Sequence, residues 1–167
     1  MTKNFFAVAI LTISFFACKK SISENVMING SPATADIEPH NKLRDVTIIT
    51  SANKAANTEI FTWSASGCIA DNGSWADDKV LWGAVQSPVV GTLHDTFTLN
   101  GNKGSIKISF NGLLKPTDDP DVFMINGSWH VLAGTDLYKG LIGQGKGTVM
   151  INFSQSTATS TLEGQVK

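Results

Sequence analysis

The sequence predicts an all-β domain, a sandwich or a barrel, that follows an N-terminal export signal. Beyond residue 43, apolar and polar residues alternate with a period of two in one segment after another, as in half-buried strands. Gly, Asn, Asp and Pro separate these segments about every ten residues, the spacing of sandwiches and barrels. The first 18 residues differ, because they hold one apolar run that ends in a cysteine.

The N-terminal run has the order of a bacterial lipoprotein signal. Lys3 precedes the apolar segment Phe5–Ala17, whose 13 residues fit a signal peptide better than a membrane-spanning helix. A small residue before Cys18 resembles a lipobox, in which the cysteine is acylated and becomes the mature N-terminus. We expect residues 1–17 to be a signal peptide and Cys18 to carry lipid, with ordinary cleavage near Ala17 as the alternative.

Lipid on Cys18 would place the domain outside the cytoplasm, in a bacterial cell envelope, with the membrane as a partner through the anchor. Lys19 stands where an acidic residue retains enteric lipoproteins at the inner membrane, which favours the outer membrane. Cys68 would then stand alone, leaving no pair for a disulfide, so the core would have to hold the fold unaided.

A polar linker is expected to join the anchor to the domain. Residues 18–42 show little periodicity and contain Pro32 and Pro39, which predicts an extended tether. A first strand at Val26–Ile28 is the alternative. The β domain then occupies residues 43–167.

Charge and motifs argue against several partners. The chain has 13 Lys+Arg and 14 Asp+Glu, with Arg44 the only arginine, so it lacks the basic stripe of a nucleic-acid binder. No Gly-Lys-Ser/Thr, His-x-His or Cys-x-x-Cys motif occurs, and we predict no cofactor and no metal. A metal site assembled across strands from His40, His94 and His130 is the weaker alternative.

Seven segments carry the strand alternation, and turn signals at 100–104, 116–121 and 155–156 separate several of them. The segment Ser74–Ala84 is the helix candidate, because Ser74 and Asp77 could form a weak capping box, but its short length favours a strand or loop. The seven predicted strands are 45–52, 59–66, 91–100, 104–114, 121–134, 147–154 and 160–167.

Five glycines between residues 133 and 148 raise the question of a phosphate-binding loop. Such a loop needs a helix after its glycines, whereas a strand follows Gly145. Gly143, Gly145 and Gly147 are spaced by two, which puts them on one face of an extended segment. There they would let a neighbouring strand or a large side chain approach closely, so we interpret them as scaffold.

The same region resembles the signature of bacterial members of the allene oxide cyclase and dirigent barrel group. Asp136 stands where that signature commonly has glycine, and Asp tolerates a left-handed turn. The resemblance covers about residues 60–166 and implies an eight-stranded antiparallel barrel, without implying a shared reaction. No catalytic residue of the plant cyclases is carried over to this chain. The residues that carry the resemblance are Trp129, Val131, Gly134, Thr135, Tyr138, Gly140, Leu141, Gly143 and Gly145.

Asp95 is the most distinctive polar residue of the predicted strands. Alternation places it on the same face as Leu93, Phe97 and Leu99. If that face lines a barrel lumen, the carboxylate needs partners or has a raised pKa, and it could orient a ligand or transfer protons. A rim position or a bulge that turns it outward is the alternative, favoured because Asp is seldom fully buried.

Two copies of Asn-Gly-Ser-Trp, at 72–75 and 126–129, are interpreted as turns that each precede a tryptophan anchor. The glycosylation sequons at Asn29, Asn72 and Asn126 are likewise interpreted as turns. His130 is expected at the surface. The acidic segment 118–121 lacks the spacing of a calcium loop and predicts a solvated turn.

Three functions remain open on the sequence. The barrel could bind a small apolar molecule, with Trp63, Trp82 and Trp129 lining one end and with Asp95, Trp129 and Tyr138 as pocket residues. It could be a cyclase-like or dirigent-like enzyme that steers a reactive intermediate. It could be a structural envelope protein whose lumen is filled by its own side chains. A fully packed lumen would remove the first two.

Overall fold

The computed structural model describes residues 42–55, 58–83 and 91–167, which form one closed barrel of eight antiparallel strands. The predicted all-β class and the eight-stranded barrel are confirmed. The predicted signal peptide, Cys18, the alternative strand at Val26–Ile28, Asn29 and His40 lie outside the described residues. The strands are β1 (Arg44–Ala55), β2 (Thr58–Gly67), β3 (Asp71–Trp82), β4 (Gly91–Gly101), β5 (Gly104–Pro116), β6 (Val122–Gly134), β7 (Gly143–Asn152) and β8 (Thr157–Val166), with a 3-10 turn, η1 (Asp136–Tyr138), before β7.

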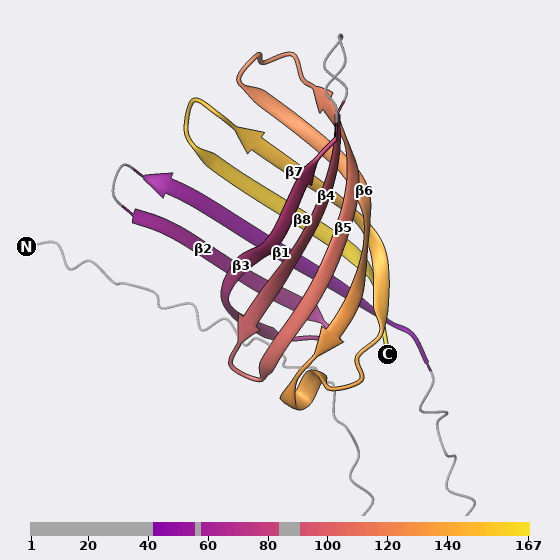
Figure 1. Ribbon diagram of the computed structural model, residues 1–167. Helices are drawn as coiled ribbons and strands as arrows, with labels where there is room; N and C mark the ends of the chain where they lie inside the picture. The colour runs from indigo at the N-terminus through magenta and orange to yellow at the C-terminus, as the bar shows by residue number, and fades with distance from the viewer. Residues whose placement is uncertain (1–41, 56–57, 84–90) are drawn as a thin grey trace, which may run out of the picture.

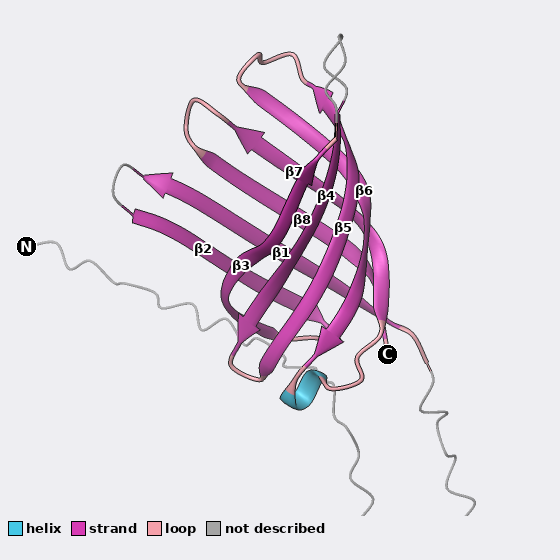
Figure 2. Cartoon of the chain, viewed as in Figure 1, coloured by secondary structure: helices cyan, strands magenta, loops and turns pink. Residues whose placement is uncertain are grey.

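Each strand pairs with its neighbours in the chain, and β1 pairs with β8 to close the barrel. Figure 1 shows β1, β2, β7 and β8 crossing behind β3 to β6, and Figure 2 shows how small the helical turn is. We call the end that holds the β2–β3 and β4–β5 turns and η1 the plugged end. The opposite end, where β5 turns into β6 and β7 into β8, is the hairpin end. Arg44 pairs with Val166, so both ends of the described domain lie at the plugged end.

The predicted alternation determines which residues face the lumen and which face solvent. Alternate residues of every strand point inward, and those in the middle of the barrel and toward the plugged end are buried and mostly apolar. Outward positions are rich in Thr, Ser and Asn, such as Thr96 and Thr98 on β4. The buried lumen residues include Val46, Ile48, Trp63, Leu93, Phe97, Leu99, Ile106, Ile108, Phe110, Ile125, Trp129, Leu162 and Val166.

The segment with the capping-box pattern is the strand β3, in agreement with the preference for strand or loop. Its register to β4 shifts between Asp77 and Lys79, which inserts Asp78 as an extra residue. Such a bulge restores the inward and outward sides of a strand after an insertion. Asp77 therefore lies opposite Phe97 on the lumen side, whereas Asp78 faces outward.

Two local predictions are wrong. Both Asn-Gly-Ser-Trp copies lie within strands, β3 and β6, and form no turns. Gly73 and Gly127 sit against the neighbouring strands there, where an added Cβ would lie 2.0 Å and 2.2 Å from a carbonyl oxygen. The strand predicted over residues 147–154 ends earlier, at Asn152, and Phe153 is exposed in the following turn.

The seam between β2 and β3 is the weakest of the barrel. Only four residue pairs join these strands, from Thr62–Ser74 to Ala65–Asp71, whereas the other seams hold nine to eleven. Pairing therefore stops halfway toward the hairpin end. The Trp75 side chain lies at this point and donates a hydrogen bond from Nε1 to the carbonyl oxygen of Ser51 on β1 (3.1 Å).

Asp71 and Tyr138 form the centre of the plugged end. The Tyr138 hydroxyl, carried by η1, donates to the buried Asp71 carboxylate at 2.7 Å. Backbone N–H groups of Asn72, Asn102 and Lys103 donate to the same carboxylate at 2.9 to 3.2 Å. Burial would raise the pKa of Asp71, but these four hydrogen bonds outweigh burial and lower it. One carboxylate thus joins the β4–β5 turn to η1.

Inward-facing glycines make room for the large side chains of the lumen. An added Cβ would lie 2.7 Å from Trp129 Nε1 at Gly145, and 3.0 Å from the Phe110 ring at Gly147. At Gly143 it would lie 2.5 Å from Val166. Asp136 adopts a positive φ of 49°, so the left-handed turn exists without the glycine that the resemblance leads one to expect.

Replacing Gly145 by valine is expected to lower the free energy of unfolding by about 2–3 kcal/mol, because its Cβ would lie 2.0 Å from the Glu163 carbonyl oxygen and 2.7 Å from Trp129. Chemical denaturation would measure this. Gln144→Val, one residue away and exposed on the outer face, is the control and should change stability by less than about 0.5 kcal/mol. Equal effects of the two variants would contradict the packing role of Gly145.

Candidate functional site

A cavity of about 60 Å³ lies in the lumen toward the hairpin end. It begins where the large packed side chains of the middle stop, with Phe110 and Leu162 as its floor toward the plugged end. A single water needs roughly 10–15 Å³ by such a measure, so the cavity has room for a few waters or for one end of a small molecule. Its lining residues are Thr50, Trp75, Leu93, Asp95, Phe97, Phe110, Val149, Ala158, Thr159, Ser160 and Leu162.

Asp95 is the ionisable residue of this lining. It pairs with Val80 on β3 and Phe110 on β5, so its side chain points into the lumen as the alternation predicted. The rim or bulge placement that the rarity of buried Asp favoured is wrong, because the bulge lies on β3 and turns Asp78 outward instead. The Asp95 Oδ1 atom is fully buried and accepts no hydrogen bond from any described residue. Such an atom is unfavourable unless a ligand, a water or a proton meets it.

The surroundings of Asp95 disfavour its charge. Burial, then the nearby carboxylate of Asp77, and to a smaller degree Asp78, raise the pKa of Asp95 to about 7 against a lowering effect of the Thr96 backbone N–H. Burial and Asp78 also raise the pKa of Asp77. By contrast, hydrogen bonds from Thr98 and Lys107 lower the pKa of the outward Asp78. Asp95 thus lines an apolar space with no basic side chain in its lining. Asp77 is exposed and lies outside this lining, and its carboxylate acts on Asp95 from the lumen side of β3.

Two other polar side chains of the cavity bond to each other. Thr50 and Ser160 share a buried hydrogen bond of 2.6 Å between their hydroxyl oxygens. Aromatic rings line the side next to the weak seam: Trp75 packs edge-to-face against Phe61 at 5.0 Å and against Phe97 at 5.9 Å. The cavity is therefore aromatic on one wall, hydroxyl-bearing on another, and acidic at Asp95.

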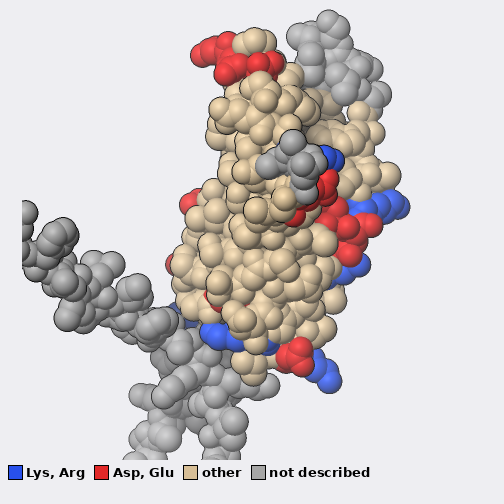
Figure 3. All heavy atoms as spheres, turned by 90° about the vertical axis from the view of Figure 1, so that its left-hand side faces the viewer, with Lys and Arg blue, Asp and Glu red and all other residues tan. Residues whose placement is uncertain are grey.

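Lumen-facing residues of β3 become more exposed to solvent toward the hairpin end. Val80 pairs with Asp95 and Trp82 pairs with Leu93, yet their exposed fractions are 39% and 51%. Phe123 and Phe153 add an edge-to-face pair at this end, 5.4 Å apart. Figure 3 views the molecule from the side on the left of Figure 1, where uncharged residues form most of the visible surface and acidic side chains gather in separate clusters. Among the described residues, the lumen side is thus least covered at the hairpin end.

The other predicted pocket residues lie elsewhere. Trp129 is 1% exposed, donates from Nε1 to the carbonyl oxygens of Lys146 and Glu163, and does not line the cavity. Tyr138 belongs to the plugged end. Trp63 is buried there as well, with its Nε1 bonded to the Asn100 carbonyl, whereas Trp82 is exposed at the opposite end. The three tryptophans therefore do not line one common end.

Four residues of the site were not identified from the sequence. Trp75 and Asp77 lie in the segment 74–84, which the sequence did not assign to either strand or loop. The bulge at Asp78 also interrupts the alternation there, so the inward positions could not be predicted. Thr50 and Ser160 belong to β-branched and Ser/Thr-rich runs in which inward and outward positions have similar polarity. Their pairing becomes visible only when β1 meets β8 across 110 positions of sequence.

Within the described ranges, no three His, Cys, Asp or Glu side chains lie close enough to hold a metal ion. His94 is exposed and hydrogen-bonds to Asn111, and His130 is exposed as predicted. The acidic turn is solvated: Asp119 accepts from the backbone N–H of Asp121 at 2.9 Å.

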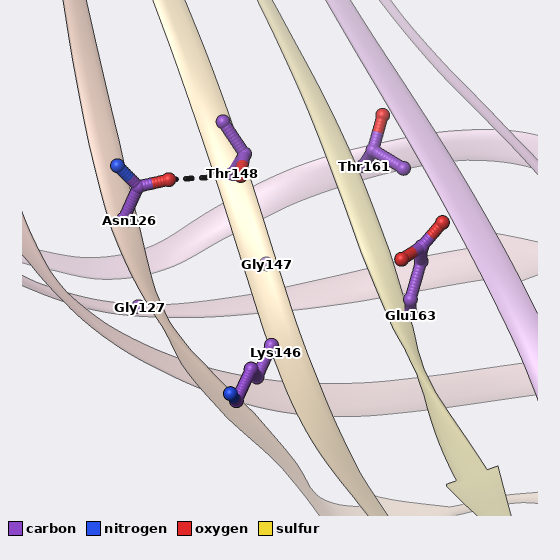
Figure 4. Close-up of a pocket in the computed structure, with 7 residues that line it drawn as sticks. All are labelled: Asn126, Gly127, Lys146, Gly147, Thr148, Thr161 and Glu163. Carbon is purple, nitrogen blue, oxygen red and sulfur yellow. Dashed lines mark hydrogen bonds between the residues drawn. The ribbon is translucent and has the colours of Figure 1, made fainter.

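A second hollow, of about 360 Å³, lies on the outer wall across β6, β7 and β8. Figure 4 shows Thr148 donating to Asn126 (3.0 Å), and the Lys146 and Glu163 side chains pointing away from each other. Its lining is exposed and polar, over the backbones of Gly127 and Gly147. Its lining lacks the buried, unpartnered polar atom that marks the lumen cavity.

Cys68 lies in the turn between β2 and β3 and packs partly buried against the core. Its sulfur is disulfide-bonded, and the partner lies outside the described residues. The prediction that Cys68 stands alone is therefore wrong. Its backbone N–H donates to the Asp45 carbonyl (3.0 Å), which holds the turn against the start of β1.

Comparisons with models of protein families, with curated proteins and with solved structures gave no match for this chain. No helix in the described part is both long and apolar enough to cross a membrane. The functional argument therefore rests on the geometry of the lumen site.

Asp95→Asn is expected to raise stability, and more so at higher pH. The folded protein holds the Asp95 proton up to a pKa of about 7, whereas the unfolded chain releases it near 3.8. Wild-type stability should therefore fall as pH rises between these values, by about 1–3 kcal/mol after allowance for solvent screening. Asp95→Asn lacks this loss, so the difference in free energy of unfolding between the variant and the wild type should grow from pH 4 to pH 8. Urea denaturation would measure it.

Asp78→Asn is the matched control for this experiment. Asp78 is adjacent in sequence to Asp77, but faces outward and its pKa is lowered, so this variant should gain no stability with rising pH. A constant difference between Asp95→Asn and the wild type from pH 4 to pH 8 would contradict the raised pKa of Asp95.

Proposed function

We propose that this domain binds a small molecule whose apolar body enters the barrel from the hairpin end and whose polar end reaches Asp95. The observation that carries the proposal is the lumen cavity with a buried carboxylate oxygen that no described residue satisfies. Few polar groups in an otherwise apolar hollow are typical of small-molecule sites. The exposure of lumen-facing Val80 and Trp82 supports an entry route from solvent.

The dimensions limit what enters. About 60 Å³ accommodates a head group, and the rest of a ligand would extend along Trp82 and the rim of the hairpin end. The site is thus suited to an elongated molecule that is held at one end.

The two other functions make different demands on the same site. A cyclase-like or dirigent-like enzyme would need a second polar group acting with Asp95 on the bound molecule, and its pKa of about 7 would suit proton transfer. The hydroxyls nearest in the lining, Thr50 and Ser160, already bond to each other, which favours binding over catalysis. A structural barrel would need a filled lumen, which the cavity argues against.

The location proposed for the domain is the bacterial cell envelope. A lipid on Cys18 and a disulfide at Cys68 both fit export from the cytoplasm. The chain holds two cysteines, so an intrachain disulfide at Cys68 and lipidation of Cys18 exclude each other in one molecule. With either bond, β1 starts at the plugged end, opposite the proposed entry at the hairpin end.

Lipidation predicts that the wild type incorporates labelled palmitate and that Cys18→Ala does not. Alkylation of the purified protein with and without reductant tests the alternative, an intrachain disulfide, because such a bond blocks both thiols until it is reduced. If the wild-type protein incorporates no palmitate and its two thiols react only after reduction, the proposed lipid anchor is wrong. Export from the cytoplasm would still be supported by the disulfide.

Native mass spectrometry of the protein purified from its own host tests the binding function. We expect one apolar small molecule per chain in the wild type. Ala158→Phe should give an empty protein, because Ala158 lines the cavity and a phenyl group there would fill it. Thr161→Phe, on the outer face of the same strand, is the matched control and should retain the ligand.

Circular dichroism would first verify that both variants keep the β fold. A wild type that comes out empty and also fails to bind added 1-octanol would contradict the proposed function and favour the structural barrel.

A further inference from the structure

The charge of the lumen site restricts the ligand beyond its being apolar. Asp95 lines the cavity, and Asp77 lies on the lumen side of β3 opposite Phe97, one inward position closer to the middle of the barrel. Asp78 points outward from the same strand and is paired with Lys107, so it is not part of the site. The lining of the cavity contains no Lys, Arg or His to balance Asp95 and Asp77.

We propose that the lumen site selects a cationic ligand, an alkyl or aryl ammonium whose charged group lies at Asp95 and Asp77 and whose apolar part points to the hairpin end. This inference rests on the proposed function and names the class of molecule bound. An ammonium group would supply the hydrogen-bond donor that the buried Oδ1 atom of Asp95 lacks.

The aromatic wall supports the same chemistry. Trp75 and Phe97 line the cavity together with Asp95 and pack edge-to-face, and Phe61 packs on the Trp75 ring outside the lining. Ammonium groups are attracted to the faces of such rings, most strongly when they are desolvated. Carboxylates together with aromatic rings satisfy both the charge and the apolar carbons of an organic amine.

Other ligand charges fit less well. A fatty carboxylate would bring another negative group next to Asp95, whose pKa the carboxylate of Asp77 already raises. A calcium ion takes six to eight oxygen ligands at ordinary sites, and two carboxylates with an already bonded hydroxyl pair do not provide them. An organic monocation needs only one or two acceptors.

The inference predicts a definite pH dependence. The carboxylates that raise the pKa of Asp95 are Asp77, on the lumen side of β3, and to a smaller degree Asp78, which points outward from the same strand. The other strands of the lining present Thr50, Phe110, Val149 and Ser160. His94, next to Asp95 in sequence, points outward to Asn111. An ammonium ligand needs ionised Asp95, so its affinity should fall as pH drops below about 7, approaching a tenfold loss per pH unit.

Three probes with the same apolar chain separate the alternatives: octylammonium, 1-octanol and octanoate. Titration of the purified protein, followed by calorimetry and by tryptophan fluorescence, would give each dissociation constant from pH 5.5 to pH 8.5. At pH 8 we expect octylammonium to bind at least tenfold more tightly than 1-octanol, and octanoate to bind more weakly than 1-octanol. Octylammonium, like the lysine amine, stays protonated over this range.

Variants assign the selectivity to named groups. Asp95→Asn should abolish the preference for octylammonium and its pH dependence while leaving 1-octanol binding within a few-fold. Asp77→Asn should weaken octylammonium binding by a smaller factor. Asp78→Asn, which removes the outward carboxylate paired with Lys107, is the matched control and should leave the preference for octylammonium largely unchanged.

The outcomes are separable from those of the proposed function. Failure of all three probes to bind would overturn the binding function itself. Binding of 1-octanol with equal or tighter binding of octanoate, or octylammonium affinity that rises as the pH falls, would overturn only the cationic selectivity.

Discussion

The narrow lumen of an eight-stranded barrel is the constraint on which the other features depend. Large side chains fit inside such a barrel only where small residues face them. Phe110 and Trp129 occupy the middle and the plugged half because glycines on neighbouring strands leave space for their rings. Where this glycine-faced packing ends, toward the hairpin end, smaller residues such as Ala158 and Ser160 line the lumen and the cavity begins. These inward glycines are Gly112, Gly127, Gly145, Gly147 and Gly164.

The two inward-facing aspartates at opposite ends show how the surroundings of one residue type set its chemistry. Asp71 accepts four hydrogen bonds, and these outweigh its burial and favour the charged form, so the carboxylate ties turns together. Asp95 has a buried oxygen without a donor and a second carboxylate nearby, so its surroundings favour the protonated form. A satisfied carboxylate stabilises the fold, whereas an unsatisfied one is a group through which another molecule can bind.

The fold was largely predictable because alternation follows from the pleat of each strand and needs no knowledge of its partners. The inward position of Asp95 followed from the same rule, and doubt arose only from the rarity of buried aspartates. Features that depend on pairing were not predictable: the bulge at Asp78, the short β2–β3 seam, and the Thr50–Ser160 contact. Trp129 and Tyr138 were recognised as important, but sequence spacing cannot tell which end of a barrel a side chain occupies.

The unequal pairing of the strands determines where the chain could be circularly permuted. The ends of the described domain meet at β1 and β8, which are joined along ten residue pairs. The least paired neighbours, β2 and β3, are consecutive in sequence. A circular permutant that links Val166 to Arg44 and opens the backbone in the turn at 68–70 would move the chain break to the least paired interface. In the permutant, all consecutive strands would be joined by nine to eleven residue pairs. Only the contact that closes the barrel, between its first and last strands, would rest on four pairs.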